Sequence, residues 1–167
     1  KWGKLSKKGG LSAGAGLAAG VALAARDRGE VKLIFQSLWC PMLDDRNNYV
    51  SSYAINDPRV WSRDDNLRAW QAYLGKDFNG NDTSPYAAPC RAKELAGLPP
   101  VYMRVGSLDL FLDENTAYAQ RLVAAGVQTD FTVIDGAFHA FEMLPGAELS
   151  RQVRNGHFAA IRDALFQ

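Results

Sequence analysis

Hydrophobic residues recur along the chain in two alternating patterns, one typical of buried strands and one typical of helices. Three runs rich in β-branched and aromatic residues predict strands, and the first of them has the composition of a strand buried on both faces. Several Ala- and Leu-rich or amphipathic segments predict helices, most of which are closed by a glycine. The predicted strands span 31–39, 100–106 and 128–135, the predicted helices span 12–28, 61–75, 111–126 and 146–166, and polar or loop-like residues fill 44–58 and 76–100.

This alternation of helices and strands predicts a single α/β domain. The chain has 167 residues, of which 47% are hydrophobic, which is enough for one core. Parallel strands joined by right-handed helical crossovers carry helices on both faces of the sheet. We therefore expect a three-layer sandwich with a mostly parallel sheet and with functional residues at the carboxyl ends of the strands.

Three loops expected near these carboxyl ends carry a serine, an aspartate and a histidine. Ser12 precedes the first helix, Asp109 follows the strand at 100–106, and His139 follows the strand at 128–135. Acyl transfer by a hydroxyl needs this set, because an imidazole must take the hydroxyl proton and a carboxylate must hold the imidazole in the correct tautomer. The chain order Ser, Asp, His is the order found in α/β-hydrolases.

The residues around Ser12 have the spacing of a nucleophile elbow, Gly10-Leu11-Ser12-Ala13-Gly14. Such an elbow strains the serine backbone between a strand and a helix and brings the residues two before and two after it close together, which favours glycine at both places. The helix that starts there directs its first N–H groups at a developing oxyanion, and the amide of Ala13 is one candidate donor.

Each of these residues also has a simpler interpretation. Ser12 could be the N-cap of the first helix, and Asp113 is an alternative to Asp109 that could instead cap or orient the helix after it. The stretch 14–20, GAGLAAG, fits the spacing of a dinucleotide-binding loop. That motif must follow a strand and be paired with an acidic residue at the end of the next strand, and neither condition is met here.

The chain also contains the segments GLSAGAGLAAGVALAARDRG, PMLDDR, GSLDLFLDENTAYAQRLVAAGV and DGAFHAF. In this order they resemble the bacterial hormone-sensitive-lipase-like carboxylesterases, the fold-3 group of the α/β-hydrolases. The resemblance runs from about Gly10 to the C-terminus and corresponds to the C-terminal half of that fold. It implies that Ser12 is the nucleophile, His139 the base and Asp109 its carboxylate partner. It also implies hydrolysis of small-molecule carboxylic esters with no metal or organic cofactor.

The chain departs from this family at its start. Residues 1–9, KWGKLSKKG, form an atypical basic leader where the family has an apolar strand. Because lysines are costly in a central buried strand, we expect no strand in this leader. Residues 10–167 then form a partial hydrolase domain with a helical lid insertion at about 44–98. The family's HGGG motif, which supplies hydrogen-bond donors to the oxyanion, is absent. The loss of one such donor slows the reaction about 10²–10³-fold. We therefore expect weak or no hydrolysis by this chain alone.

These departures leave two further expectations open. The strand at 31–39 would expose an unpaired edge, which predicts a homo-oligomer. The alternative to an enzyme is a non-catalytic hydrolase remnant that acts as an oligomerising or binding module.

Composition narrows the remaining classes of function. The net charge is +1, from 19 basic and 18 acidic side chains, so nothing favours a nucleic-acid partner. No stretch is long and apolar enough for a membrane span, and no signal peptide is evident. The cysteines, Cys40 and Cys90, have no metal-binding spacing and fit a reducing compartment, which predicts a cytoplasmic protein.

Other polar and aromatic residues have structural interpretations. Asp44, Asp45 and Arg46 are expected to form loop salt bridges, with a substrate contact as the alternative, and His157 is expected to be a surface or packing residue of its helix. The aromatic residues Trp61, Trp70 and Tyr73 are expected to form the packing face of the lid helix, with an acyl pocket as the alternative.

Overall fold

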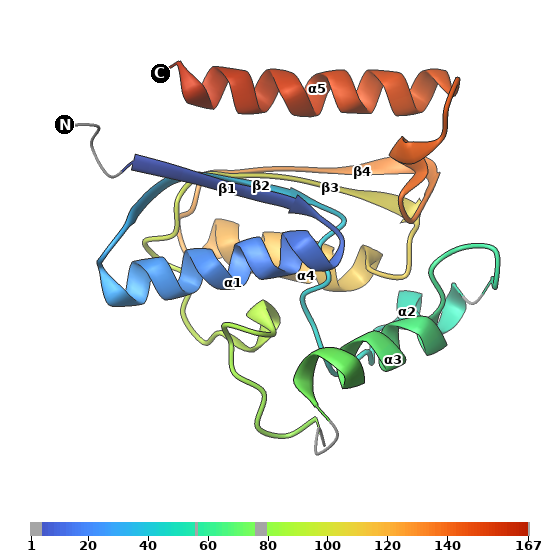
Figure 1. Cartoon of the computed structure of the whole chain (residues 1–167), viewed down its shortest axis with the longest axis horizontal. Helices are drawn as coiled ribbons and strands as arrows, with labels where there is room; N and C mark the ends of the chain where they lie inside the picture. Colours follow the sequence, from blue (N-terminus) through green and yellow to red (C-terminus); the bar gives the residue numbers. More distant parts are fainter. Residues whose placement is uncertain (1–4, 56, 76–79, 167) are drawn as a thin grey trace.

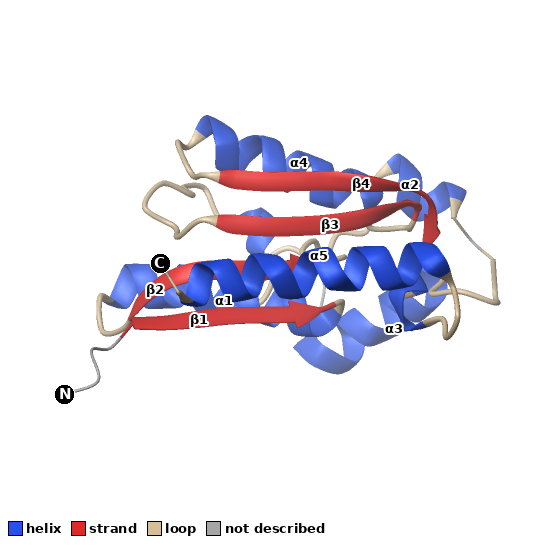
Figure 2. Ribbon diagram, turned by 90° about the horizontal axis from the view of Figure 1, so that it is seen from above, coloured by secondary structure: helices blue, strands red, loops and turns tan. Residues whose placement is uncertain are grey.

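The computed structural model describes residues 5–55, 57–75 and 80–166, which build an α/β sandwich of three layers (Figure 1). Four parallel strands lie in the order β1-β2-β3-β4, with bounds Leu5–Leu11, Lys32–Trp39, Val101–Leu108 and Thr129–Phe138. Helices α1 (Ala13–Arg28) and α4 (Leu112–Ala124) cover one face, and α5 (Glu148–Leu165) lies along the other (Figures 1 and 2). The predicted fold class is confirmed.

The segment between β2 and β3 holds the helices α2 (Val50–Ala54) and α3 (Arg63–Leu74) and the short 3-10 helix η1 (Pro89–Arg91). A second 3-10 helix, η2 (Phe141–Met143), follows β4. The sequence pattern predicted α3 but not α2. Tertiary contacts hold α2 in place, since Ser51 donates its backbone N–H to Asp113 and its hydroxyl to the Leu110 carbonyl. Such long-range bonds leave no local periodicity in the sequence.

The expectation that the basic leader supplies no strand is wrong. Strand β1 begins at Leu5 and pairs in parallel with β2, so that Leu11 lies opposite Trp39. Lysines are tolerated in β1 for two reasons. Within the described ranges this strand pairs only with β2, and one of its faces borders an open groove of about 340 Å³. Lys7 and Lys8 line that groove, Lys8 with its side chain exposed. Lys1 and Lys4 lie outside the described residues.

This pairing also corrects the position of the free sheet edge. Strand β2, which was expected to be the edge, is hydrogen-bonded to β1 on one side and to β3 on the other. The outer edge of the described sheet therefore belongs to β1.

The small residues of α1 allow this helix to pack closely on the rest of the domain. A Cβ added to Gly16 would overlap the carbonyl oxygen of Met42, and one added to Gly20 would overlap that of Tyr86. The buried alanines of α1, among them Ala15 and Ala19, join the main hydrophobic core. Close helix packing thus accounts for Gly16 and Gly20 in the glycine-rich stretch.

Helix α5 is anchored to the sheet by His157. Its ring lies 4.5 Å from that of Trp39 and 5.7 Å from that of Tyr102, and Ser37 Oγ is within 3.3 Å of Nδ1. His157 is thus a packing residue, as the sequence predicted. Among the described residues, no helix has the length and apolar character needed to cross a membrane.

The position of His157 predicts a loss of stability at mildly acidic pH. Burial, and secondarily the charge of Arg104, lowers the pKa of His157. The folded state therefore favours the neutral ring, and the stability this provides is complete above the unfolded-state pKa of about 6.5 and is lost as the pH falls below it. Between pH 7.5 and pH 5 we expect the Tm of the unchanged protein to fall more than that of His157→Phe, a variant that keeps an aromatic ring but cannot bind the proton. Equal falls in calorimetric Tm would contradict this role.

Candidate active site

Ser12 occupies the sharp turn between β1 and α1. Its backbone has φ 55° and ψ −123°, a conformation that costs a non-glycine residue about 1–3 kcal/mol. Surrounding bonds hold it there, because its N–H donates to the Trp39 carbonyl at 2.9 Å and its carbonyl accepts from Gly16 and Met42. Its side chain makes no capping bond to α1, which removes the interpretation of Ser12 as a side-chain N-cap.

The two glycines of the elbow have different surroundings. A Cβ on Gly10 would overlap the backbone of Gly14 and Ala15, so only glycine fits at this position. A Cβ on Gly14 would meet no atom of the described chain within 4 Å. The expectation that both positions need a tiny residue is therefore right for Gly10 and wrong for Gly14.

The structure brings Ser12, His139 and Asp109 into one chain of hydrogen bonds at the carboxyl ends of the strands. Ser12 Oγ lies 2.9 Å from His139 Nε2, and His139 Nδ1 lies 2.8 Å from Asp109 Oδ2. The second oxygen of Asp109, Oδ1, accepts the N–H of Phe111 at 2.9 Å. Asp109 is only 1% exposed and His139 only 9%, so bulk water competes little for these bonds.

Asp113, the alternative carboxylate, lies elsewhere. Its Oδ2 accepts the backbone N–H of Ser51 at 2.8 Å and thereby ties α2 to the start of α4. Asp109, and not Asp113, is the carboxylate that reaches the His139 ring.

Aromatic side chains border the His139 ring. The Phe111 ring meets it edge-on at 5.1 Å between centroids, and the Trp61 ring lies 6.2 Å away. These neighbours limit the directions that the imidazole can take.

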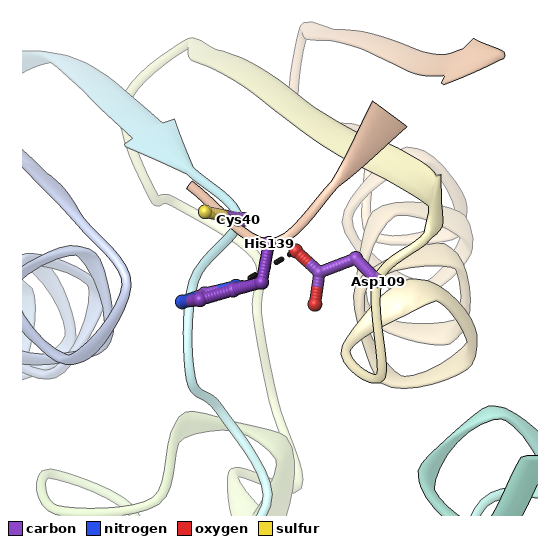
Figure 3. Close-up of side chains that lie close together, drawn as sticks. All are labelled: Cys40, Asp109 and His139. Atoms are coloured by element: carbon purple, nitrogen blue, oxygen red, sulfur yellow. Dashed lines mark hydrogen bonds and ion pairs between the residues drawn. The ribbon is translucent and has the colours of Figure 1, made fainter. Parts of the chain in front are cut away.

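Cys40 lies beside the same imidazole and carboxylate, as Figure 3 shows, and sequence reasoning did not place it there. Its Sγ lies within 4.8 Å of a ring nitrogen of His139 and an oxygen of Asp109, so these three residues are the candidate metal ligands in the described ranges. Burial, together with the charges of Asp109 and Glu142, raises the pKa of the Cys40 thiol well above its usual range. The thiol is therefore protonated at neutral pH, and both ring nitrogens already have partners, so this arrangement fits a hydrogen-bond chain better than a metal site.

A second residue that the sequence did not single out is Glu142 in η2. It is buried, and neither carboxylate oxygen has a hydrogen-bond partner in the described part of the chain. Burial raises its pKa. Its position three residues after His139 is the one signal in the sequence that could have drawn attention to it.

The loop that follows β2 is held by ion pairs. Asp44 pairs with Arg46 at 2.5 Å, and Asp45 pairs with Arg91 of η1 at 2.6 Å. The predicted salt bridges of this loop are confirmed, with Arg91 as an additional partner.

An apolar cavity of about 210 Å³ opens next to Ser12. Its walls come from α1, from the loop after β2 and from the region of α3, and they include the aromatic residues Trp61, Trp70 and Tyr73. These residues thus pack around α3 and also line a cavity. Both the packing face and the pocket that the sequence suggested for them are therefore compatible with their positions.

Residues 9–143 match a family model described as the alpha/beta hydrolase fold. The carboxylesterase NlhH of Mycobacterium tuberculosis is 31% identical over 147 residues, which is 84% of this chain and 45% of that protein. The esterase LipI of the same organism is 34% identical over 146 residues, 84% of this chain and 44% of that protein. The chain thus spans about half the length of the curated relatives it matches.

Solved structures show the same relationship. A bacterial heroin esterase superposes with a TM-score of 0.93 at 41% identity, over 96% of this chain and 52% of that one. The esterase LipW from Mycobacterium marinum superposes with a TM-score of 0.87 at 36% identity, over 96% and 50% of the two chains.

Proposed function

Because the chain belongs to the hormone-sensitive-lipase-like carboxylesterases of the α/β-hydrolase fold, we propose that it contributes a Ser-His-Asp triad to the hydrolysis of carboxylic esters. One observation carries the proposal: the hydrogen bonds that join Ser12, His139 and Asp109 at 2.9 and 2.8 Å.

In the proposed reaction Ser12 is the nucleophile. His139 takes the Ser12 proton through Nε2 as the oxygen attacks the ester carbonyl, and Asp109 stabilises the imidazolium that forms. The same imidazolium then protonates the departing alcohol, and a water molecule activated by His139 hydrolyses the acyl-enzyme.

The N-terminus of α1 supports the negative charge that develops in this reaction. Helix α1 begins at Ala13, and the first N–H groups of a helix have no partner inside the helix. We propose that the Ala13 amide donates to the oxyanion and that the strained turn at Gly10 and Ser12 aims it there. The cycle uses a hydroxyl, an imidazole, a carboxylate and backbone amides, and its proposed substrate is a small-molecule ester.

The experiment that tests this function compares the full chain with its Ser12→Ala variant on p-nitrophenyl butyrate. Hydrolysis that disappears with Ser12 supports the enzyme. Equal rates in the two proteins would favour the alternative, a non-catalytic hydrolase remnant.

We further propose that the chain associates with a second copy through the outer edge of β1. Within the described ranges this strand pairs only with β2, and a free strand edge exposes backbone groups that another strand can bond. The two free cysteines, Cys40 and Cys90, fit the cytoplasm, the compartment we propose. Sedimentation over a range of concentrations should show a dimer or larger species, and a monomer throughout would contradict the association.

A further inference from the structure

We propose that Arg154 is a positioning residue of the reaction, because its bond to η2 holds the turn that carries His139 in the geometry of the triad. This inference rests on the proposed ester hydrolysis and adds a residue outside the three that carry it out. Arg154 belongs to α5, which lies across the sheet from α1, the helix that starts after Ser12 (Figure 1).

The backbone directly after His139 is strained. Ala140 has φ 62° and ψ 22°, the left-handed conformation that residues with a side chain rarely adopt. Such a conformation persists only where the surrounding structure holds it. The Met143 N–H donates to the Ala140 carbonyl at 3.0 Å, so the strained turn is continuous with η2. The direction of the His139 ring therefore depends on what holds η2 in place.

Two side chains of α5 hold η2 by its backbone carbonyls. Arg154 Nη1 donates to the carbonyl of Glu142. The buried Ser150 hydroxyl donates to the carbonyl of Phe141 at 2.8 Å. Arg154 and Ser150 are four residues apart and lie on the same face of the helix. Because the two carbonyls belong to the second and third residues after His139, α5 fixes the chain close to the imidazole.

The surroundings of Glu142 make the Arg154 bond the more important of the two. The Glu142 side chain is buried, and neither carboxylate oxygen has a hydrogen-bond partner among the described residues. Burial raises the pKa of this carboxyl, and the positive charge of Arg154 opposes that rise. Arg154 thus holds the Glu142 backbone by a hydrogen bond and also stabilises the ionised form of its side chain.

The loss of this hold should misplace the imidazole. Ser12 Oγ and Asp109 Oδ2 lie 2.9 and 2.8 Å from the two ring nitrogens of His139, so even a small shift of the ring weakens one of these bonds. A displacement of about 1 Å can slow a reaction by about a hundredfold. Because the ester does not need the imidazole in order to bind, the loss should fall on kcat and leave KM nearly unchanged.

The test compares the full chain with Arg154→Met, a variant that keeps an apolar stem but has no donor and no charge. We expect its kcat for p-nitrophenyl butyrate to fall about tenfold to a hundredfold, with KM changed little. Arg154→Lys, which retains a donor and the charge, should restore most of kcat. Arg151→Met is the matched control on the same helix, because the Arg151 side chain is exposed and is bonded to Glu148 of α5.

A proton NMR signal tests the position of His139 without any hydrolysis. The proton between Nδ1 and the Asp109 carboxylate is expected far downfield, because charge-assisted hydrogen bonds are short and strong. The loss of the signal in His139→Gln identifies it. In Arg154→Met the signal should move upfield or broaden, and in Arg151→Met it should stay. Ser150→Ala removes the second bond to η2 and should change the signal in the same direction, so it serves as the test if Arg154→Met does not fold.

The outcomes separate the positioning role from the function. Folded Arg154→Met and Ser150→Ala variants that keep both kcat and the downfield signal would overturn the proposal. Equal losses in Arg154→Met and Arg151→Met would also overturn it, because α5 would then act through its general stability. If no ester hydrolysis depends on Ser12, the proposed function fails and the NMR signal still decides. Its loss in Arg154→Met but not in Arg151→Met supports the positioning role, and its persistence in Arg154→Met contradicts it.

Discussion

Replacing Ser12 by alanine is expected to reduce ester hydrolysis to the rate in buffer, because a serine hydrolase that loses its nucleophile loses about 10⁶-fold in kcat, which exceeds the weak activity expected of this chain alone. The physical reason is that in the proposed reaction the hydroxyl oxygen forms the covalent bond to the acyl carbon, and no other described oxygen is bonded to His139 Nε2. The measurement is the initial rate of p-nitrophenolate release from the butyrate ester, corrected for the rate in buffer.

The matched control for this experiment is Ser62→Ala. Ser62 is the N-cap of α3 and accepts the N–H of Asp65, so its loss should cost about 1 kcal/mol of stability while hydrolysis continues. A Ser12→Ala variant that folds, as judged by circular dichroism, and still hydrolyses the ester at the original rate would contradict the nucleophile role. A Ser62→Ala variant that loses all hydrolysis would show that α3, and not Ser12, limits the reaction.

Most of the fold could be predicted because the sheet and its covering helices carry strong local patterns. The strands predicted at 31–39, 100–106 and 128–135 correspond to β2, β3 and β4, and the predicted helices correspond to α1, α3, α4 and α5. The prediction failed at β1, since Lys7 and Lys8 exclude only a central strand that is buried on both faces. At the edge of the described sheet, beside an open groove, lysine side chains remain near water and the desolvation cost does not arise.

The residues of the site could be predicted where a strand or a motif marks them. Asp109 and His139 each follow a predicted strand, and parallel strands bring their carboxyl ends together. Ser12 was predicted from the spacing of the elbow, because no strand was expected before it. Cys40 also follows a strand, but a single cysteine gives no spacing pattern, so only the fold reveals its place beside His139. Glu142 was missed because its burial is tertiary, and its position three residues after His139 is the one signal of it in the sequence.

Asp109→Asn is expected to lower kcat by about 10⁴-fold while the fold and the affinity for ester remain. In the unchanged protein Oδ1 of Asp109 accepts the Phe111 N–H and Oδ2 faces His139 Nδ1. An asparagine that keeps the first bond with its oxygen must direct its NH₂ group at Nδ1. The ring then accepts at Nδ1 and carries its proton on Nε2, the atom that should take the proton of Ser12.

Asp109→Asn changes the tautomer of the His139 ring and leaves ester binding intact. We therefore expect kcat to fall and KM to change little. Asp113→Asn is the matched control, because it makes the same chemical change four residues later, at a carboxylate that accepts from Ser51 and touches no part of the His139 ring. It should retain kcat within a few-fold, although α2 loses part of its anchor. Equal losses of kcat in the two variants would mean that a general disturbance of the loop after β3 slows the reaction, and the assignment of Asp109 as the partner of the imidazole would have to be abandoned.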